Sequence, residues 1–306
     1  MRFEQPLQYT YSEKPELEKR EKPLSHFEMQ KVLMNKVSSE TNASVQELYG
    51  MNQLVLLNGR VALRNFADAY GGIYAKNEVI EDKQKIYDAD RSHSGSFMPA
   101  TQERYAKQYG LHTEKEIIDH YKKKKEEHTS NQAEMIITAL LHKALKERFL
   151  VVRASEFDDY LNGMDNLILD KQTGAVICAF DEVIENGNDE GKASPKIAKM
   201  QAKAEQGGAH AKYGFALEKG RLVRSKVSHI PVFYINLKSS DLQNLTESLF
   251  TNFDGDMTDL ENDIFSHLVA SIEEQKSMLE DLHLPAVMRR KLSEFDIDGL
   301  KSFCKV

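Results

Sequence analysis

The chain has 306 residues, of which 41% are hydrophobic and 29% charged, and this composition predicts a globular protein with one large domain or two of ordinary size. The formal net charge of −7 argues against a protein that coats nucleic acid, although it leaves room for a local basic groove. Two cysteines, Cys178 and Cys304, are too few for a disulfide framework or a structural zinc site.

Hydropathy gives no sign of a membrane protein. No apolar run approaches the ~20 residues needed to span a bilayer, and the N-terminal stretch lacks the apolar core of a signal peptide. We therefore expect a cytoplasmic protein with no membrane partner.

The N-terminal part of the chain shows helical periodicity between polar stretches. Residues 1–25 combine prolines with a dense charge run, which predicts an extended N-terminal arm. Helices are predicted over 26–37 and 44–69, the second with Ser44 as its N-cap. Residues 71–110 are polar and rich in turn residues, and we predict a linker or mobile loop there.

A capping box, Thr113 to Glu116, predicts a helix that continues to about residue 127. Its lysine run, 122–125, is interpreted either as a solvated helix face or as a phosphate-binding patch, and the acidic residues that follow it favour the solvated face. Another helix, with an apolar stripe, is predicted over 131–147.

The next stretch predicts a β-hairpin with carboxylates at one end. Its apolar runs, 166–170 and 175–180, are joined by turn residues that end in Gly174. Asp165 immediately precedes the first run and Asp181 immediately follows the second, so antiparallel pairing brings both toward the same end of the ribbon.

After the hairpin, a helix over 194–206 places three lysines, Lys196, Lys199 and Lys203, on one face. Strands are predicted over 213–217, 222–227 and 230–237, and helices over 241–250, 259–283, 285–294 and 297–303. This order predicts an α/β layer with a mixed sheet.

The hairpin carboxylates suggest metal-assisted phosphodiester hydrolysis, which needs two or three oxygen ligands for Mg²⁺, for which Mn²⁺ can substitute, and usually a cation. Asp165 and Asp181 would bind the metal, with the carbonyl of Glu182 as a third oxygen. Glu134, on the preceding helix, would reach the same site as a further ligand or through water. A simpler interpretation is that both aspartates only terminate strands.

Residues 131–237 resemble the PD-(D/E)xK nuclease superfamily, which has the restriction-endonuclease-like fold. The resemblance consists of a helix with Glu134, then GMDNLILD, then AVICAFDEV, then a helix and closing strands. It implies that Asp165 corresponds to the first aspartate of the motif, Asp181 to its second acidic position and Glu134 to the glutamate often found on the first core helix.

The resemblance also implies a domain plan. A restriction-endonuclease-like core, with a central mixed sheet flanked by helices, would occupy residues 111–239. Helical extensions would occupy residues 1–110, which include the N-terminal arm and the loop predicted over 71–110, and residues 240–306.

Two positions depart from the motif. Met164 replaces its proline, and Val183 replaces its lysine. Because the hairpin lacks its own lysine, the cation would have to come from the next helix, with Lys199 as first choice and Lys196 as second.

Two neighbouring features have open interpretations. We predict that Glu156, Asp158 and Asp159 are solvated or capping residues, with proximity of Asp159 to the metal as the alternative. Arg153 is expected to pair with Glu156 rather than to contact a phosphate.

The leading functional hypothesis is a Mg²⁺-dependent nuclease, with DNA as the first choice of substrate and RNA as the second. The alternative is a catalytically inactive nuclease-fold module whose helical extensions bind a protein partner or a second copy of the chain; the missing lysine and the acidic net charge favour it. A third hypothesis is an all-helical assembly protein with a small sheet.

Overall fold

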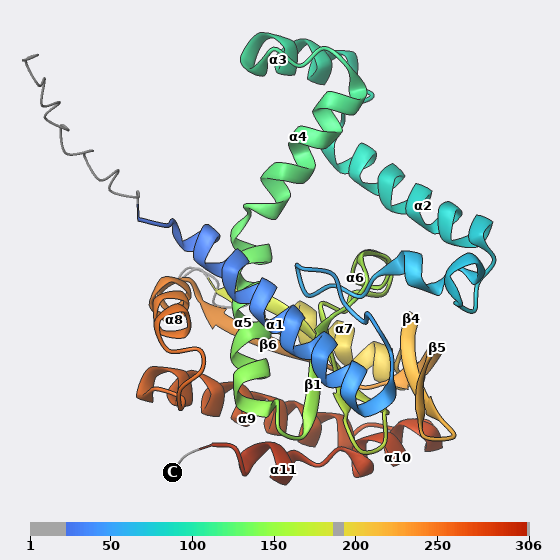
Figure 1. Cartoon of the computed structure of the whole chain (residues 1–306), viewed down its shortest axis with the longest axis vertical. Coiled ribbons are helices and arrows are strands. Elements are labelled where there is room, and N and C mark those ends of the chain that lie inside the picture. The colour runs from blue at the N-terminus through green and yellow to red at the C-terminus, as the bar shows by residue number, and fades with distance from the viewer. Residues whose placement is uncertain (1–22, 186–192, 305–306) are drawn as a thin grey trace, which may run out of the picture.

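A four-stranded mixed sheet lies at the centre of the fold in the computed structural model, which describes residues 23–185 and 193–304 (Figure 1). The strand order is β1-β2-β3-β6, in which the first three strands are antiparallel and β6 runs parallel to β3. These strands are β1 (Phe149–Arg153), β2 (Asn166–Asp170), β3 (Val176–Glu185) and β6 (Val232–Lys238). The predicted mixed α/β arrangement is therefore confirmed.

The predicted hairpin forms, and its second strand is longer than expected. Gly174 adopts φ 62° in the turn, a conformation that glycine tolerates without steric cost. Pairing with β6 extends β3 as far as Glu185, so Asp181 and Glu182 lie within the strand rather than after it. The strand β1, which adds to the hairpin on the other side, was not predicted.

Side chains alternate between two hydrophobic clusters on opposite faces of the sheet. Phe149 and Val151 belong to one cluster, and Leu150 and Val152 to the other. The first face is covered by α1 (His26–Tyr49), α5 (Thr129–Leu145), α8 (Ser239–Thr251) and α9 (Asp259–Glu280). The second is covered by a separate hairpin, β4 (Ala209–Glu218) and β5 (Arg221–Ile230), together with a loop from the N-terminal region.

Helix α1 corrects the prediction of two helices over 26–37 and 44–69. The helix continues through the expected break and ends at Gly50, where φ is 69°. Ser38 and Thr41 are buried in the middle of its inward face, so polar residues hide the helical period in the sequence. The helices in residues 51–75 are two short 3-10 helices, η1 (Leu63–Phe66) and η2 (Asp68–Tyr70).

The loop over residues 50–62 borders the outer edge of β1. The amide of Arg153 donates to the carbonyl of Gly59 at 3.1 Å, and the amide of Val61 donates to the carbonyl of Arg153 at 3.0 Å. An isolated parallel bridge consequently joins Arg60 to Arg153.

Three helices project from the rest of the molecule (Figure 1), and we call them the arm and the remainder the body. They are α2 (Lys76–Ser94), α3 (Pro99–Tyr109) and α4 (Glu114–Glu126). The prediction of a linker or loop over 71–110 is therefore wrong. The inward face of α2 includes two aspartates, Asp82 and Asp90, and α3 buries no residue, so neither helix shows an apolar stripe.

Other predicted elements are confirmed. The capping box of Thr113 and Glu116 opens α4. The remaining helices, close to their predicted ranges where one was made, are α7 (Ala193–Glu205), α10 (Ala286–Glu294), α11 (Ile297–Lys301) and the unpredicted α6 (Glu156–Asn162). Within the described residues, no helix combines the length and apolar character needed to cross a bilayer.

Candidate metal centre

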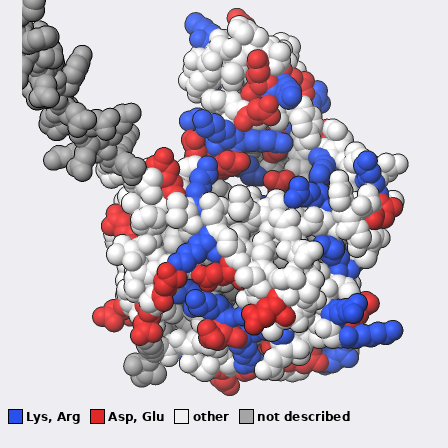
Figure 2. All heavy atoms as spheres, in the orientation of Figure 1, with Lys and Arg blue, Asp and Glu red and all other residues white. Residues whose placement is uncertain are grey.

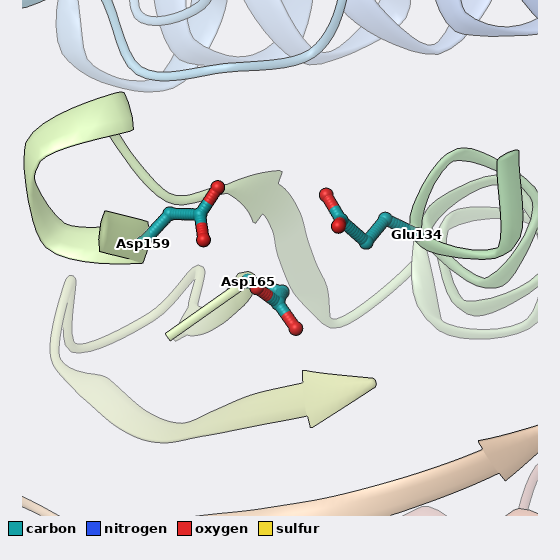
Figure 3. A group of neighbouring side chains, drawn as sticks. All are labelled: Glu134, Asp159 and Asp165. Carbon is teal, nitrogen blue, oxygen red and sulfur yellow. The ribbon is translucent and has the colours of Figure 1, made fainter. Parts of the chain in front are cut away.

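Three carboxylates from separate elements meet at the open end of the hairpin (Figure 3). Glu134 extends from α5, Asp159 from α6 and Asp165 from the residue before β2, and one oxygen of each lies within 4.8 Å of the others. Ser155 caps the start of α6, and Gly163, with φ 58°, ends it and turns the chain into β2. This short helix brings Asp159 back over Asp165.

The backbone of the hairpin fixes Asp165. Its amide donates to the carbonyl of Phe180 at 2.8 Å, and its Oδ2 accepts from the amide of Glu182 at 2.7 Å. The backbone of β3 therefore orients Asp165, at the end of the hairpin where the sequence places it.

The carboxylate of Glu182, which is only 8% exposed, lies beside Asp165, but among the described residues its oxygens are not within 4.8 Å of all three other carboxylates. Its Oε1 accepts from the side-chain amide of Asn166 at 2.6 Å, and Asn166 in turn accepts from the hydroxyl of Thr138 at 2.9 Å. Its Oε2 is buried, and no donor among the described residues reaches it. An unpaired carboxylate oxygen in the interior is costly unless a proton or a cation binds it.

The pKa values of this pair follow from their surroundings. Burial raises the pKa of Glu182 to about 7, and burial together with the adjacent Glu182 raises the pKa of Asp165 well above its usual value. Two neighbouring carboxyl groups in a low-dielectric site resist ionising together, so the pair retains a proton near neutral pH when no cation is bound.

Two arginines bind the other carboxylates. Arg60 reaches Glu134 Oε2 at 3.0 Å and Asp159 Oδ2 at 2.9 Å, and Arg153 also donates to Glu134 Oε2. Arg153 is held by Asn131 as well, whose side-chain oxygen lies 2.7 Å away. Its predicted pairing with Glu156 is therefore corrected, because the partner is Glu134.

The donor set fits a hard divalent cation. All four groups offer carboxylate oxygens, the ligands that Mg²⁺ and Mn²⁺ prefer. Within the described residues, the contacts on Glu134, Asp159 and Asp165 are to one oxygen of each, so each group is oriented by a donor and retains a second oxygen. The Oε2 of Glu182, which accepts no hydrogen bond among the described residues, is likewise open to a cation.

Asp181 lies elsewhere, although the register of the hairpin places its backbone opposite that of Asp165. Side chains alternate along β3, so Asp181 points away from the face that holds Glu182. Its Oδ1 accepts from Lys196 at 2.9 Å, and among the described residues it is not a member of the acidic group. Glu182 lies beside Asp165 through its carboxylate, whereas the sequence suggested its carbonyl.

The predicted lysines do not enter the acidic group either. Lys196 is bound to Asp181, and Lys199 is exposed. The ammonium groups of Lys199 and Lys203 lie beside Gly163, 3.5 and 3.3 Å from the position that a Cβ would take there. Lys203 donates to the carbonyl of Asn162, at the end of α6.

A cavity of about 400 Å³ adjoins the acidic group, where the arm meets the body. Asp159 belongs to both, and Arg60, which lines the cavity, pairs with Glu134 and Asp159 of the acidic group. Figure 2 shows basic side chains gathered there with acidic ones among them. The basic lining residues are Lys31, Arg60, Lys122, Lys125 and Arg153, and the acidic ones are Asp90, Glu126, Glu156 and Asp159.

Sequence reasoning missed one residue of this region and undervalued two others. Arg60 was assigned to a helix that does not exist, and Asp159 was named only as an alternative. Lys125 was included in a run interpreted as solvated. The signal available for Lys125 was its spacing of three from Lys122, which places both on one face of α4.

Comparisons with protein-family models, with curated proteins and with solved structures found no match to this chain.

Proposed function

We propose that this protein is a metal-dependent phosphodiesterase of the nuclease type, in which Glu134, Asp159, Asp165 and Glu182 hold Mg²⁺ or Mn²⁺. The observation that carries the proposal is the buried Oε2 of Glu182, which accepts no hydrogen bond from a donor among the described residues and belongs to a carboxylate beside Asp165. A bound cation would replace the proton that the pair otherwise retains.

The order of elements supports the proposal. Helix α5 with Glu134, the hairpin β2–β3, helix α7 and strand β6 follow one another as in the resemblance to the PD-(D/E)xK nucleases. We propose a restriction-endonuclease-like core on this basis, with Glu182 in place of Asp181 as its second acidic residue.

A divalent cation in such a site polarises a phosphate and lowers the pKa of bound water. The chain itself supplies orientation and charge. Glu182 holds Asp165 through its amide, and Arg60 lies between the acidic group and the cavity, where a guanidinium can neutralise charge on a phosphate. Lys203 and Lys199 stand at the end of α6 as further cations.

The test compares Asp165→Asn and Glu182→Gln with Asp181→Asn, a matched control at the opposite position of the hairpin. Calorimetry with Mn²⁺ and cleavage of labelled DNA and RNA are measured on the full chain. We expect the first two variants to lose Mn²⁺ binding and at least ~100-fold of the cleavage rate, and the control to retain both. Wild-type protein that binds no Mn²⁺ and cuts neither substrate would sink the proposal.

One observation favours the alternative of an inactive binding module. Arg60 and Arg153 already neutralise Glu134 and Asp159, and a structural ion-pair network requires no metal. In that case Arg60→Met would weaken folding, and no variant would change the response to Mn²⁺.

A further inference from the structure

Two ammonium groups in the cavity lack a carboxylate partner. The ammonium of Lys125 contacts the hydroxyl of Tyr160 and lies 3.5 Å from the centre of that ring. Lys31 lies 4.6 Å from the centre of the Phe27 ring. Within residues 23–185 and 193–304, no ion pair joins either lysine to an acidic group.

Burial makes Lys125 the more informative of the two. Its side chain is partly buried between α4 and α6, and burial lowers the pKa of its ammonium. Asp90, which accepts from the Tyr160 hydroxyl, pairs with Lys122 at 3.5 Å instead. A partly desolvated cation without a counter-ion gains most from an anion that enters the cavity.

The lysine run of α4 divides into two faces. Lys122 and Lys125 line the cavity, whereas Lys123 and Lys124 are exposed to solvent on the opposite side. The four residues have the same charge and lie on the same helix, but they differ in whether they face the cavity or the solvent. This division provides an internal control for any binding that depends on the cavity.

Size and lining indicate the class of anion. About 400 Å³ is near the lower end of the ~300–1,000 Å³ typical of small-molecule sites, which suits one nucleotide unit and is too small for a duplex. Cations beside aromatic rings, here Lys125 with Tyr160 and Lys31 with Phe27, form the pattern that binds single strands through phosphates and bases.

We propose that the cavity between arm and body binds a single-stranded nucleic acid, with Lys122 and Lys125 at a backbone phosphate and the strand directed toward the acidic group. The proposal rests on the nuclease function for the fate of the strand, but binding itself requires no metal. Glu126 and Glu156 are exposed at the lining, and their charges reduce the affinity for a phosphate. Because the charges around the cavity are accessible to solvent, salt screens them, and we expect binding to be sensitive to salt.

The experiment measures fluorescence anisotropy of a short labelled oligothymidylate with the full chain in EDTA, so that no cleavage occurs. We expect Lys122→Ala/Lys125→Ala to weaken binding at least ~10-fold and to lower the slope of log K against log salt by ~0.7, the value for one phosphate contact on a single strand. Lys123→Ala/Lys124→Ala should leave binding unchanged. A Lys31→Ala variant, at an exposed residue without an ion pair, is expected to weaken binding several-fold even if the double variant fails to fold.

Two results would overturn the proposal: equal losses in the two double variants, which would indicate diffuse charge, and tighter binding of a duplex than of the single strand. Comparing binding in EDTA with cleavage in Mn²⁺ separates the two proposals, because binding of the oligonucleotide requires no metal. Binding without cleavage in Mn²⁺ would refute the nuclease function alone, and cleavage unaffected by Lys122→Ala/Lys125→Ala would refute the cavity alone.

Discussion

At the scale of single residues, the contact between Asp165 and Glu182 links stability to pH. The pKa of Glu182 rises from 4.5 in a solvated chain to about 7 in the folded protein because the carboxyl is buried. A raised pKa means that folding favours the protonated form. The stability it confers is fully present below about pH 4.5 and is lost as the pH rises through about 7.

Glu182→Gln should remove this loss. The amide preserves the acceptor for Asn166 and carries no charge, so in EDTA the variant should exceed the wild type at pH 8 by on the order of 2 kcal/mol in free energy of unfolding, and by little at pH 4. Urea titrations at both pH values measure the difference. Glu280→Gln, at an exposed position of α9, is the control and should show no such trend. A variant equally or less stable at pH 8 would contradict the burial argument.

At the scale of elements, a buried aspartate is among the residues that fasten the arm to the body. Asp82 of α2 is 0% exposed, accepts from the hydroxyl of Tyr213 at 2.7 Å and pairs with Lys212, both on β4. Lys212 in turn lies over the rings of Tyr74 and Phe157. A polar network of this kind positions α2, and with it the cavity wall.

Asp82→Ala should therefore loosen the arm before the body. Removing the carboxylate leaves the Tyr213 hydroxyl without its acceptor, at a cost of about 1–3 kcal/mol. Hydrogen exchange followed by mass spectrometry should show faster exchange over α2 and little change in β2 and β3. Asp88→Ala, at an exposed position on the same helix, should leave exchange unchanged. Uniform acceleration over the whole chain would show that the arm and the body open together.

Sequence patterns predicted those elements whose buried positions are apolar. The hairpin strands and the C-terminal helices are of this type, and their predicted ranges lie close to the observed ones. The arm is not, because Asp82 and Asp90 occupy its buried positions and break the hydrophobic period. Tertiary partners on β4 and α6, invisible in the local sequence, satisfy those two aspartates.

The same limit applies to the candidate site. Glu134 and Asp165 were found from the order of elements and from strand pairing, which are properties of neighbouring sequence. The placement of Asp181 was wrong because β3 continues past it, so that alternation along the strand selects Glu182. Arg60 comes from a loop that reaches β1 across the fold, and no local pattern predicts such a contact.

At the scale of the whole molecule, α5 packs between the sheet and helices from the N-terminal and C-terminal parts of the chain, namely α1, α8 and α9. From Met135 to Leu145 every residue of the helix is buried, so it has no solvent face. The ammonium of Lys143 pairs with the buried carboxylate of Glu261 on α9 at 2.7 Å. On α1 and α8, Gln30 donates to Thr246 at 2.9 Å in the same interior.

A fragment limited to residues 111–239 should accordingly fail to fold as a unit. It would expose the surface of α5 that α1, α8 and α9 cover, and it would leave Lys143 without its carboxylate partner. Near-UV circular dichroism and the dispersion of amide resonances measure the outcome, with the full chain as reference. A well-dispersed spectrum from the fragment would show that the helical extensions are dispensable for folding.

The loop over residues 50–62 has a consequence for self-association. β1 is the first strand of the sheet, and an open strand edge is a template for pairing with another chain. By bonding to Arg153, the loop that delivers Arg60 also occupies part of that edge. A side chain at Gly59, where φ is 78°, would strain the backbone of this turn and push against the terminal methyl of Met34. A substitution in this one turn would therefore expose the edge of β1 and move Arg60 away from the acidic group. Aggregation and loss of activity would then have a single cause.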